Sequence, residues 1–134
     1  MQTERVEAVI HFAAFIAVGE STREPEKYFH NNTAGSISLF AAMADAGVNK
    51  LVFSSTAAVY GNPTEIPIPE TAAISAVNPY GESKVMVEKV LDWLDATRGL
   101  RAIRLRYFNA CGANTSNSSR DLTKICSSTQ ATTP

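Results

Sequence analysis

The sequence predicts an α/β protein built on a parallel sheet, and three observations support this fold class. Short apolar runs without helical periodicity occupy residues 8–12, 50–54 and 101–107, as expected of strands buried on both faces. Two segments with helical spacing of apolar residues separate these runs. Each helical segment is followed by a glycine that can end it. The resulting order βαβαβ predicts parallel strands joined by right-handed helical crossovers.

The helical segments have recognisable ends. The first begins near Pro25 and ends at Gly47, as one long helix or a broken one. The second begins at Pro79, because proline suits the first position of a helix, and it ends at Gly99. A proline-rich loop spans residues 61–79, which is longer than a simple connection requires. Long loops at strand ends often carry function.

Length and composition limit the chain to one soluble domain. It has 134 residues, of which 45% are hydrophobic and 19% charged, so it can bury a single core. The formal net charge of −1 and the absence of a basic run argue against a nucleic-acid partner. The longest apolar stretch, residues 8–18, includes a histidine and is shorter than the roughly 18 residues of a membrane span. We therefore expect a cytoplasmic protein without a membrane partner.

The two cysteines and the end of the chain carry little signal. Cys111 and Cys126 form no C-x-x-C motif, and His11 and His30 do not stand at metal-ligand spacing from them, so neither a disulfide framework nor a metal site is expected. Ten of the 21 residues from 114 to 134 are Ser or Thr, and apolar periodicity stops there. We expect this tail not to pack, as a disordered or non-native segment.

The predicted topology brings three strand ends together. In open parallel sheets, ligands bind beyond the carboxyl ends of the strands. Those ends lie at residues 11–14, 54–58 and 107–112. We expect them to line one crevice.

One set of side chains near this crevice suggests proton-transfer chemistry. Tyr80 and Lys84 stand four residues apart at the start of the second predicted helix, which places them on one helical face. An isolated pair of this kind is usually a surface tyrosine packed on a lysine stem. Here the preceding strand also ends in Ser54-Ser55-Thr56, which supplies a hydroxyl at the ligand-binding edge.

These residues resemble the catalytic set of the short-chain dehydrogenase/reductase superfamily, a Ser or Thr, a Tyr and a Lys in this order. Within residues 6–113, six ordered blocks look like its extended, sugar-nucleotide branch and, within that branch, the UDP-glucose 4-epimerases. The blocks are VIHFAA at 9–14, VGES at 18–21, Tyr28 with Asn31-Asn32, FSSTAAVYG at 53–61, NPYG at 78–81, and RYFN at 106–109 with Gly112-Ala113.

The resemblance implies a Rossmann-like, NAD-dependent isomerase that interconverts UDP-glucose and UDP-galactose through transient oxidation at C4 of the hexose. It makes Tyr80 the acid and base, Lys84 the support of the Tyr80 phenolate and the nicotinamide ribose, and Thr56 the partner of the reacting hydroxyl. At position 16, where some members have a lysine near the NAD phosphates, this chain has Ile16. The implied cofactor contacts are Phe12, Ala13, Ala14, Ile16, Asn32, Tyr80, Lys84 and Phe108, and the implied substrate contacts are Thr56, Tyr80 and Asn109.

Several alternatives remain open. Related 4,6-dehydratases carry Asp-Glu directly after the Thr, because elimination needs a further acid and base, whereas this chain has Ala57-Ala58. That difference argues against a dehydratase. The rivals are an epimerase of N-acetylated or uronic sugar nucleotides and a non-catalytic, truncated remnant. Ordinary core packing is the alternative for Phe12 and Phe108, and His11 is expected to be a hydrogen-bonded strand histidine.

Two parts of the family pattern are missing. A dinucleotide-binding turn needs closely spaced glycines, but the nearest two of the seven glycines are twelve residues apart. We therefore expect residues 1–113 to be a partial NAD-binding catalytic domain without the N-terminal nucleotide-binding βαβ unit or the C-terminal substrate lobe, and the isolated chain to be inactive. Members of the family commonly pair through two helices. Residues 37–46 and 85–94 correspond to them, which implies a homodimer for the intact enzyme.

Overall fold

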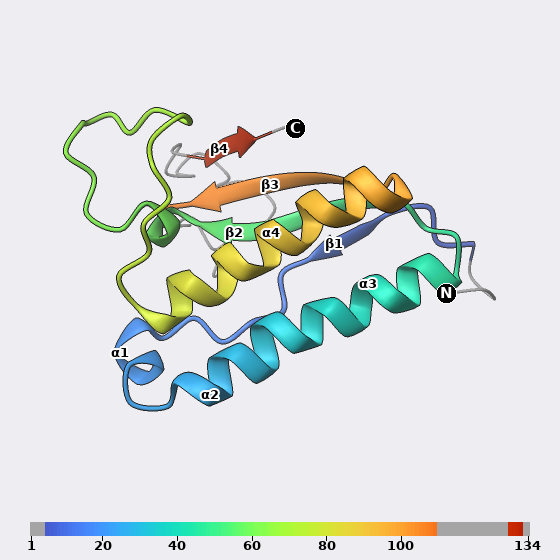
Figure 1. Ribbon diagram of the computed structural model, residues 1–134, viewed down its shortest axis with the longest axis horizontal. Helices are drawn as coiled ribbons and strands as arrows, with labels where there is room; N and C mark the ends of the chain where they lie inside the picture. Colours follow the sequence, from blue (N-terminus) through green and yellow to red (C-terminus); the bar gives the residue numbers. More distant parts are fainter. Residues whose placement is uncertain (1–4, 110–128, 133–134) are drawn as a thin grey trace, which may run out of the picture.

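The computed structural model describes residues 5–109 and 129–132, with all the longer helices on one face of a sheet (Figure 1). Helical and extended segments alternate along the chain, as the sequence predicts. In chain order they are β1 (Val9–His11), α1 (Val18–Ser21), α2 (Pro25–Tyr28), the π-helix η1 (Phe29–Ala34), α3 (Gly35–Asp45), β2 (Lys50–Thr56), the 3₁₀-helix η2 (Ala57–Tyr60), α4 (Pro79–Arg98), β3 (Arg101–Tyr107) and β4 (Thr129–Thr132).

The sheet has the predicted parallel core. Its strands follow the order β1-β2-β3-β4. Strand β2 pairs in parallel with both β1 and β3, with His11 opposite Phe53 and Thr56 opposite Tyr107. The predicted α/β class with helical crossovers is confirmed. Because the strands run in parallel, the carboxyl ends of all three lie along the same edge.

Of the tail from 114 to 134, which we expect not to pack, the structure describes only residues 129–132. Residues 129–132 form β4, which pairs antiparallel with β3. A strand at the edge of a sheet presents unpaired backbone groups that another extended segment can pair with, and threonine suits extended backbone. Residues 110–128 and 133–134, together with Cys111 and Cys126, lie outside the described residues.

The first predicted helix is a helical run with a π-turn in its middle. It begins at Pro25 in α2, widens into η1 and continues as α3 to Asp45. The buried residues of η1 are Asn32 and Thr33, whose side chains bind groups outside the helix. Such π-turns often occur at functional sites. The sequence did not predict α1 or η2, because a four-residue helix shows no periodicity.

The short helix α1 is held by a buried tyrosine. Tyr28 is fully buried, and its hydroxyl oxygen lies 2.6 Å from Glu20 Oε2 and 2.8 Å from the Ala17 carbonyl oxygen, so the two acceptors share its one hydrogen. Lys27 Nζ contacts the other carboxylate oxygen of Glu20 at 2.7 Å. These bonds fix the chain between β1 and α2, which runs beside the carboxyl edge of the sheet.

The ends of α4 follow from local chemistry. The side chain of Asn78 caps the first turn by accepting from the Gly81 amide at 2.8 Å, and Pro79 occupies the first helical position. The helix ends at Gly99, whose φ of 66° lies in the left-handed region that favours glycine. The predicted start and end of this helix are therefore confirmed.

The apolar core lies between α3, α4 and one face of the sheet. On the opposite face, Ile10 and Ile103 are 64% and 42% exposed. No helix among the described residues is long and apolar enough to cross a membrane. The core consists of Phe40, Met43, Val48, Leu51, Phe53, Val87, Leu91, Leu100 and Ala102.

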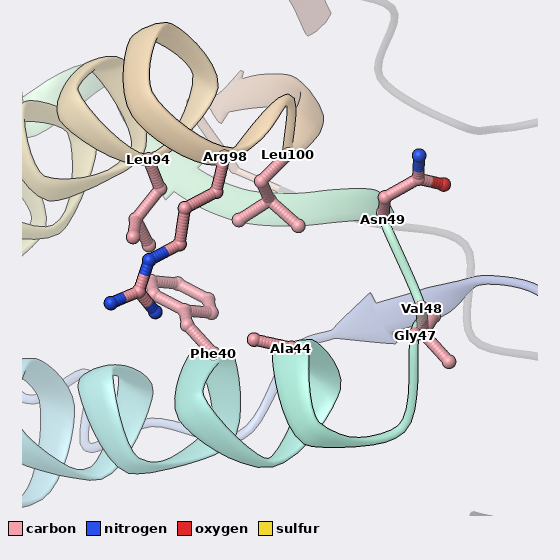
Figure 2. Close-up of a pocket in the computed structure, with 8 residues that line it drawn as sticks. All are labelled: Phe40, Ala44, Gly47, Val48, Asn49, Leu94, Arg98 and Leu100. Carbon is pink, nitrogen blue, oxygen red and sulfur yellow. The ribbon is translucent and has the colours of Figure 1, made fainter.

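A groove of about 410 Å³ lies where α3 and α4 end (Figure 2). Arg98 extends from α4 toward Phe40 of α3, and Leu94 and Leu100 line the same side. The groove lies near the amino ends of β2 and β3, because Asn49 borders it. It is thus at the opposite end of the sheet from the predicted crevice.

Candidate functional site

The carboxyl edge of the sheet gathers most of the predicted residues. Thr56 ends β2 opposite Tyr107 of β3, and residues 12–14 and 108–109 follow β1 and β3 directly. Helix α4 begins at the same edge, where β2 and β3 end (Figure 1). The convergence that the sequence predicts from the parallel topology is present.

Thr56 occupies a fixed position at this edge. It is 7% exposed, and its Oγ1 accepts from the Ala58 amide at 3.2 Å. This bond caps η2, so the turn that follows the strand sets the direction of the Thr56 hydroxyl.

Lys84 is a buried cation directly behind β2. It is 3% exposed, and its Nζ donates to the Ser54 carbonyl at 2.9 Å and lies 4.9 Å from the centre of the Phe53 ring. Burial lowers the pKa of Lys84 to about 8, since the charged form loses hydration. The ammonium therefore lies next to the strand that ends in Thr56.

His11 faces the same part of the core from β1. Its ring stacks on Phe53 with centroids 6.0 Å apart, and its Nε2 lies 3.0 Å from Ser36 Oγ. Burial lowers the pKa of His11, and the charge of Lys84 lowers it further. The expectation that His11 is a hydrogen-bonded strand histidine is confirmed.

Tyr80 lies in the first turn of α4, one turn before Lys84, and is half-buried. Side chains four residues apart share a helical face, so Tyr80 lies on the Lys84 side of the helix, closer to its N-terminus. Ser83 is fully buried, and its Oγ donates to the Tyr80 carbonyl at 2.7 Å. The first turn of α4 is thus held from both its cap and its interior.

Asn32 joins this turn to the segment after β1. Its Nδ2 donates to the Phe15 carbonyl at 3.0 Å and to Ser83 Oγ at 3.1 Å, and its Oδ1 accepts from the Phe15 amide at 2.9 Å. Thr33 Oγ1 also donates to the Ser83 carbonyl, at 3.1 Å. Asn32 is 2% exposed, so the structure gives it a positioning role. The cofactor contact that the resemblance implies for it stays a prediction.

The other predicted cofactor residues lie at the surface. Ala13 and Ala14 border an open hollow of about 420 Å³ between β1 and η1. Phe12 is 58% exposed, Phe108 41% and Ile16 70%, so none of the three is a core residue. The Phe12 ring lies 6.3 Å from that of Tyr107, and Asn109 is exposed after β3.

A buried ionic network behind Thr56 was not predicted. Glu88 and Arg106 form an ion pair at 2.7 Å between α4 and β3. Ser55 Oγ donates to Glu88 at 2.5 Å, and Arg106 donates to the Tyr60 hydroxyl at 2.8 Å. The spacing of Glu88, four residues after Lys84, was an available signal, since it continues the same helical face.

Chemically, the edge combines a phenol, a buried ammonium and a strand-end hydroxyl. Such a set can move a proton to or from a hydroxyl of a bound molecule. Within residues 5–109 and 129–132, no group of three or more His, Cys, Asp or Glu side chains is placed to hold a metal ion.

The amino-acid sequence is similar to those of known proteins. The sequence profile of the NAD dependent epimerase/dehydratase family matches residues 1–131. The chain is 56% identical over 108 residues to a UDP-glucose 4-epimerase of Streptococcus mutans, covering 81% of this chain and 32% of that protein. It is 52% identical over 110 residues to one of Lacticaseibacillus casei, covering 82% and 33%. The chain spans about a third of the length of the curated relatives it matches.

Solved structures give the same result. A UDP-glucose 4-epimerase from Stenotrophomonas maltophila, with bound NAD and formylated UDP-arabinopyranose, is 51% identical with a TM-score of 0.82, covering 85% of this chain and 34% of that one. The UDP-Glc/GlcNAc 4-epimerase of Campylobacter jejuni is 44% identical with a TM-score of 0.77, covering 86% and 35%.

Proposed function

The chain belongs to the NAD dependent epimerase/dehydratase family, and we propose that its function is that of a UDP-glucose 4-epimerase, the interconversion of UDP-glucose and UDP-galactose. In this proposal residues 1–113 are part of the NAD-binding catalytic domain. The observation that carries the proposal is Lys84, a buried cation bonded to the carbonyl of Ser54, one helical turn after Tyr80 and behind the strand that ends in Thr56.

The residues at the edge fit a dinucleotide cofactor. Gly35 also lines the hollow beside Ala13 and Ala14, together with His11, Phe15 and Asn31. The exposed Phe12 and Phe108 rings can pack on flat groups. Lys84 adds a positive charge for a ribose or phosphate oxygen. Ile16 contributes no charge at its position. NAD, when bound, supplies the acceptor for the hydride that leaves C4 of the sugar and the donor for its return.

The side chains of this chain then have distinct tasks. Thr56 holds the 4-hydroxyl group, Tyr80 removes its proton and later returns it, and Asn109 contacts the sugar nucleotide. Lys84 stabilises the negative charge on the Tyr80 oxygen, because opposite charges attract strongly where water is excluded. Epimerisation needs only this one reversible proton transfer from the protein.

Residues 57–58 support an epimerase over a dehydratase. Elimination of water requires a further acid and base, whereas Ala57 and Ala58 of η2 carry only methyl groups. N-acetylated and uronic sugar nucleotides remain rival substrates.

The test measures UDP-glucose and UDP-galactose exchange with NAD. Two proteins are assayed: the 134-residue chain and a chimera in which the aligned 108-residue segment of this chain replaces the matching segment of the Streptococcus mutans enzyme. The chimera should be active, and Tyr80→Phe within it should lose activity about 10²- to 10⁴-fold. Lys84→Met within the chimera should also lose activity, whereas Lys89→Met, at an exposed lysine of the same helix, should not. An inactive chimera would indicate that this chain is non-catalytic. Faster turnover of UDP-N-acetylglucosamine or UDP-glucuronate than of UDP-glucose would replace the proposed substrate.

We also propose that the intact enzyme is a homodimer and is cytoplasmic. Apolar side chains on the outer faces of the packed helices α3 and α4 support the dimer. Ile37, Met86 and Trp93 are 45%, 41% and 72% exposed. Trp93→Glu should convert a dimer to a monomer in analytical ultracentrifugation, and an unchanged sedimentation coefficient would exclude this surface.

A further inference from the structure

The Glu88–Arg106 pair is unusual because both charges are buried. The residues are 5% and 7% exposed, and the guanidinium donates twice to the carboxylate, through Nε at 3.2 Å and Nη2 at 2.7 Å. Burial acts to lower the pKa of Arg106, but its hydrogen bonds to Glu88 and Tyr60 raise it overall, so the guanidinium stays charged. A buried pair of this kind contributes little to stability compared with apolar side chains of the same size.

The position of the pair connects it to Tyr80 and Lys84. Residues 80, 84 and 88 continue one face of α4 at intervals of one turn. Along this face, Lys84 bonds the Ser54 carbonyl and Glu88 bonds the Ser55 hydroxyl. Two consecutive turns of α4 are therefore fixed to two consecutive residues of β2, directly before Thr56.

The charged and titratable groups around Lys84 come from three elements. His11 faces it from β1, Tyr80 and Glu88 lie on α4, and Arg106 faces the helix from β3. With Glu88 and Arg106 paired, their charges cancel. If only one of them remained, it would act on the ammonium across an interior that screens weakly.

We propose that Glu88 and Arg106 are positioning residues for Lys84: they fix the catalytic face of α4 on β2 and together keep the surroundings of the ammonium group electrically neutral. A catalytic role for this charge balance rests on the proposed function. The effect of the charge balance on the pKa of Lys84 is a property of the folded chain alone. The pair thereby keeps Lys84 available to Tyr80 and to a cofactor.

A second ion pair on the same two elements provides the control. Arg104 of β3 contacts Asp92 of α4, two residues earlier on the strand and one turn later on the helix. Its acidic side chain is 59% exposed, so water screens it. The two pairs differ mainly in burial and in their distance from Lys84.

The experiment follows the titration of the lysine side chains by NMR in the 134-residue chain, with Lys84→Met assigning the Lys84 signal. Glu88→Gln leaves the Arg106 cation and should lower the pKa of Lys84, whereas Arg106→Gln leaves the Glu88 anion and should raise it. Each shift should be of the order of one pH unit, the magnitude expected for a nearby unit charge at an effective dielectric constant of ~20. The double variant should return to the parent value, and Asp92→Asn and Arg104→Gln should leave it unchanged.

Opposite shifts and their cancellation support the proposal, because loosening of the fold would hydrate Lys84 and raise its pKa in every variant. A rise in all three variants, or no shift in any, overturns it. If a single variant fails to fold, the double variant decides: recovery of the fold with the parent titration supports charge balance, and failure of the double variant as well overturns it. None of these outcomes depends on epimerase activity.

Discussion

Helix α4 packs against strand β2, and the two ends of this contact differ in chemistry. Near the amino end of the strand, Leu51 meets a core that includes Leu91 and Leu100. Near the carboxyl end, Ser54 and Ser55 meet Lys84 and Glu88. The same two elements thus carry an apolar half and a polar half.

The difference shows how one contact between a helix and a strand can serve two purposes. Burial of apolar area at the amino end stabilises the fold. The polar end contributes less to the stability of the fold, because each buried charge loses hydration and needs a partner to offset that loss. Because the two halves share a rigid helix, the apolar half holds the polar half in place.

The apolar half should dominate stability. Leu91 is fully buried, and Leu91→Ala should lower the free energy of unfolding by about 2–5 kcal/mol through lost burial and the cavity left behind. Chemical denaturation measures this loss, with the half-buried neighbour Val90→Ala as the milder control. If the apolar half and the polar half have separate roles, Leu91→Ala should leave the pKa of Lys84 unchanged. A large shift of this pKa would contradict separate roles.

The polar half should make stability depend on alkaline pH. Burial lowers the pKa of Lys84 from 10.5 to about 8, so between these values the unfolded chain binds more protons than the folded one. Stability must then rise with pH across this window, by about 3 kcal/mol in total. Denaturation curves from pH 7 to 11 check this. Lys84→Met should remove the rise, and a rise that persists in this variant would assign it to another group.

The bonds that Asn32 makes to Phe15 and Ser83, called here the Asn32 clamp, should contribute less to the free energy of unfolding than Leu91 or Lys84 does. Asn32→Asp keeps the shape but cannot donate to the Phe15 carbonyl or to Ser83, which should cost about 2 kcal/mol. Asn49→Asp, at an exposed asparagine away from these bonds, is the control. Equal effects of the two substitutions would show that the added charge, not the clamp, is responsible.

Two helical glycines should respond in opposite directions. A Cβ on Gly81 would lie 2.9 Å from the Ala58 carbonyl oxygen, whereas one on Gly35 meets nothing within 4 Å. Gly35→Ala should therefore raise the melting temperature through its helix preference, worth about 0.5–1 kcal/mol. Gly81→Ala should lower the melting temperature, because α4 must move away from η2. Stabilisation by both would mean that this contact relaxes freely.

Much of this arrangement could be predicted from the sequence. The apolar runs at 50–54 and 101–107, the proline at 79 and the glycine at 99 depend on local chemistry, and they specified the alternation of strands and helices along the chain and the bounds of α4. The spacing of Tyr80 and Lys84 is likewise local, because four residues make about one helical turn. The β4 pairing was not predicted, since it depends on a strand edge that is distant in sequence.

The βαβαβ order follows from the sequence alone, as do the hydroxyl, phenol and amine groups that Thr56, Tyr80 and Lys84 bring to the carboxyl edge of the sheet. The bonds of Asn32 to Phe15 and Ser83, and the pairing of Glu88 with Arg106, arise only in the packed structure. Periodicity reports which face of an element is apolar. It does not report which polar groups of other elements will bond across that face, because those partners are brought together only when the layers pack.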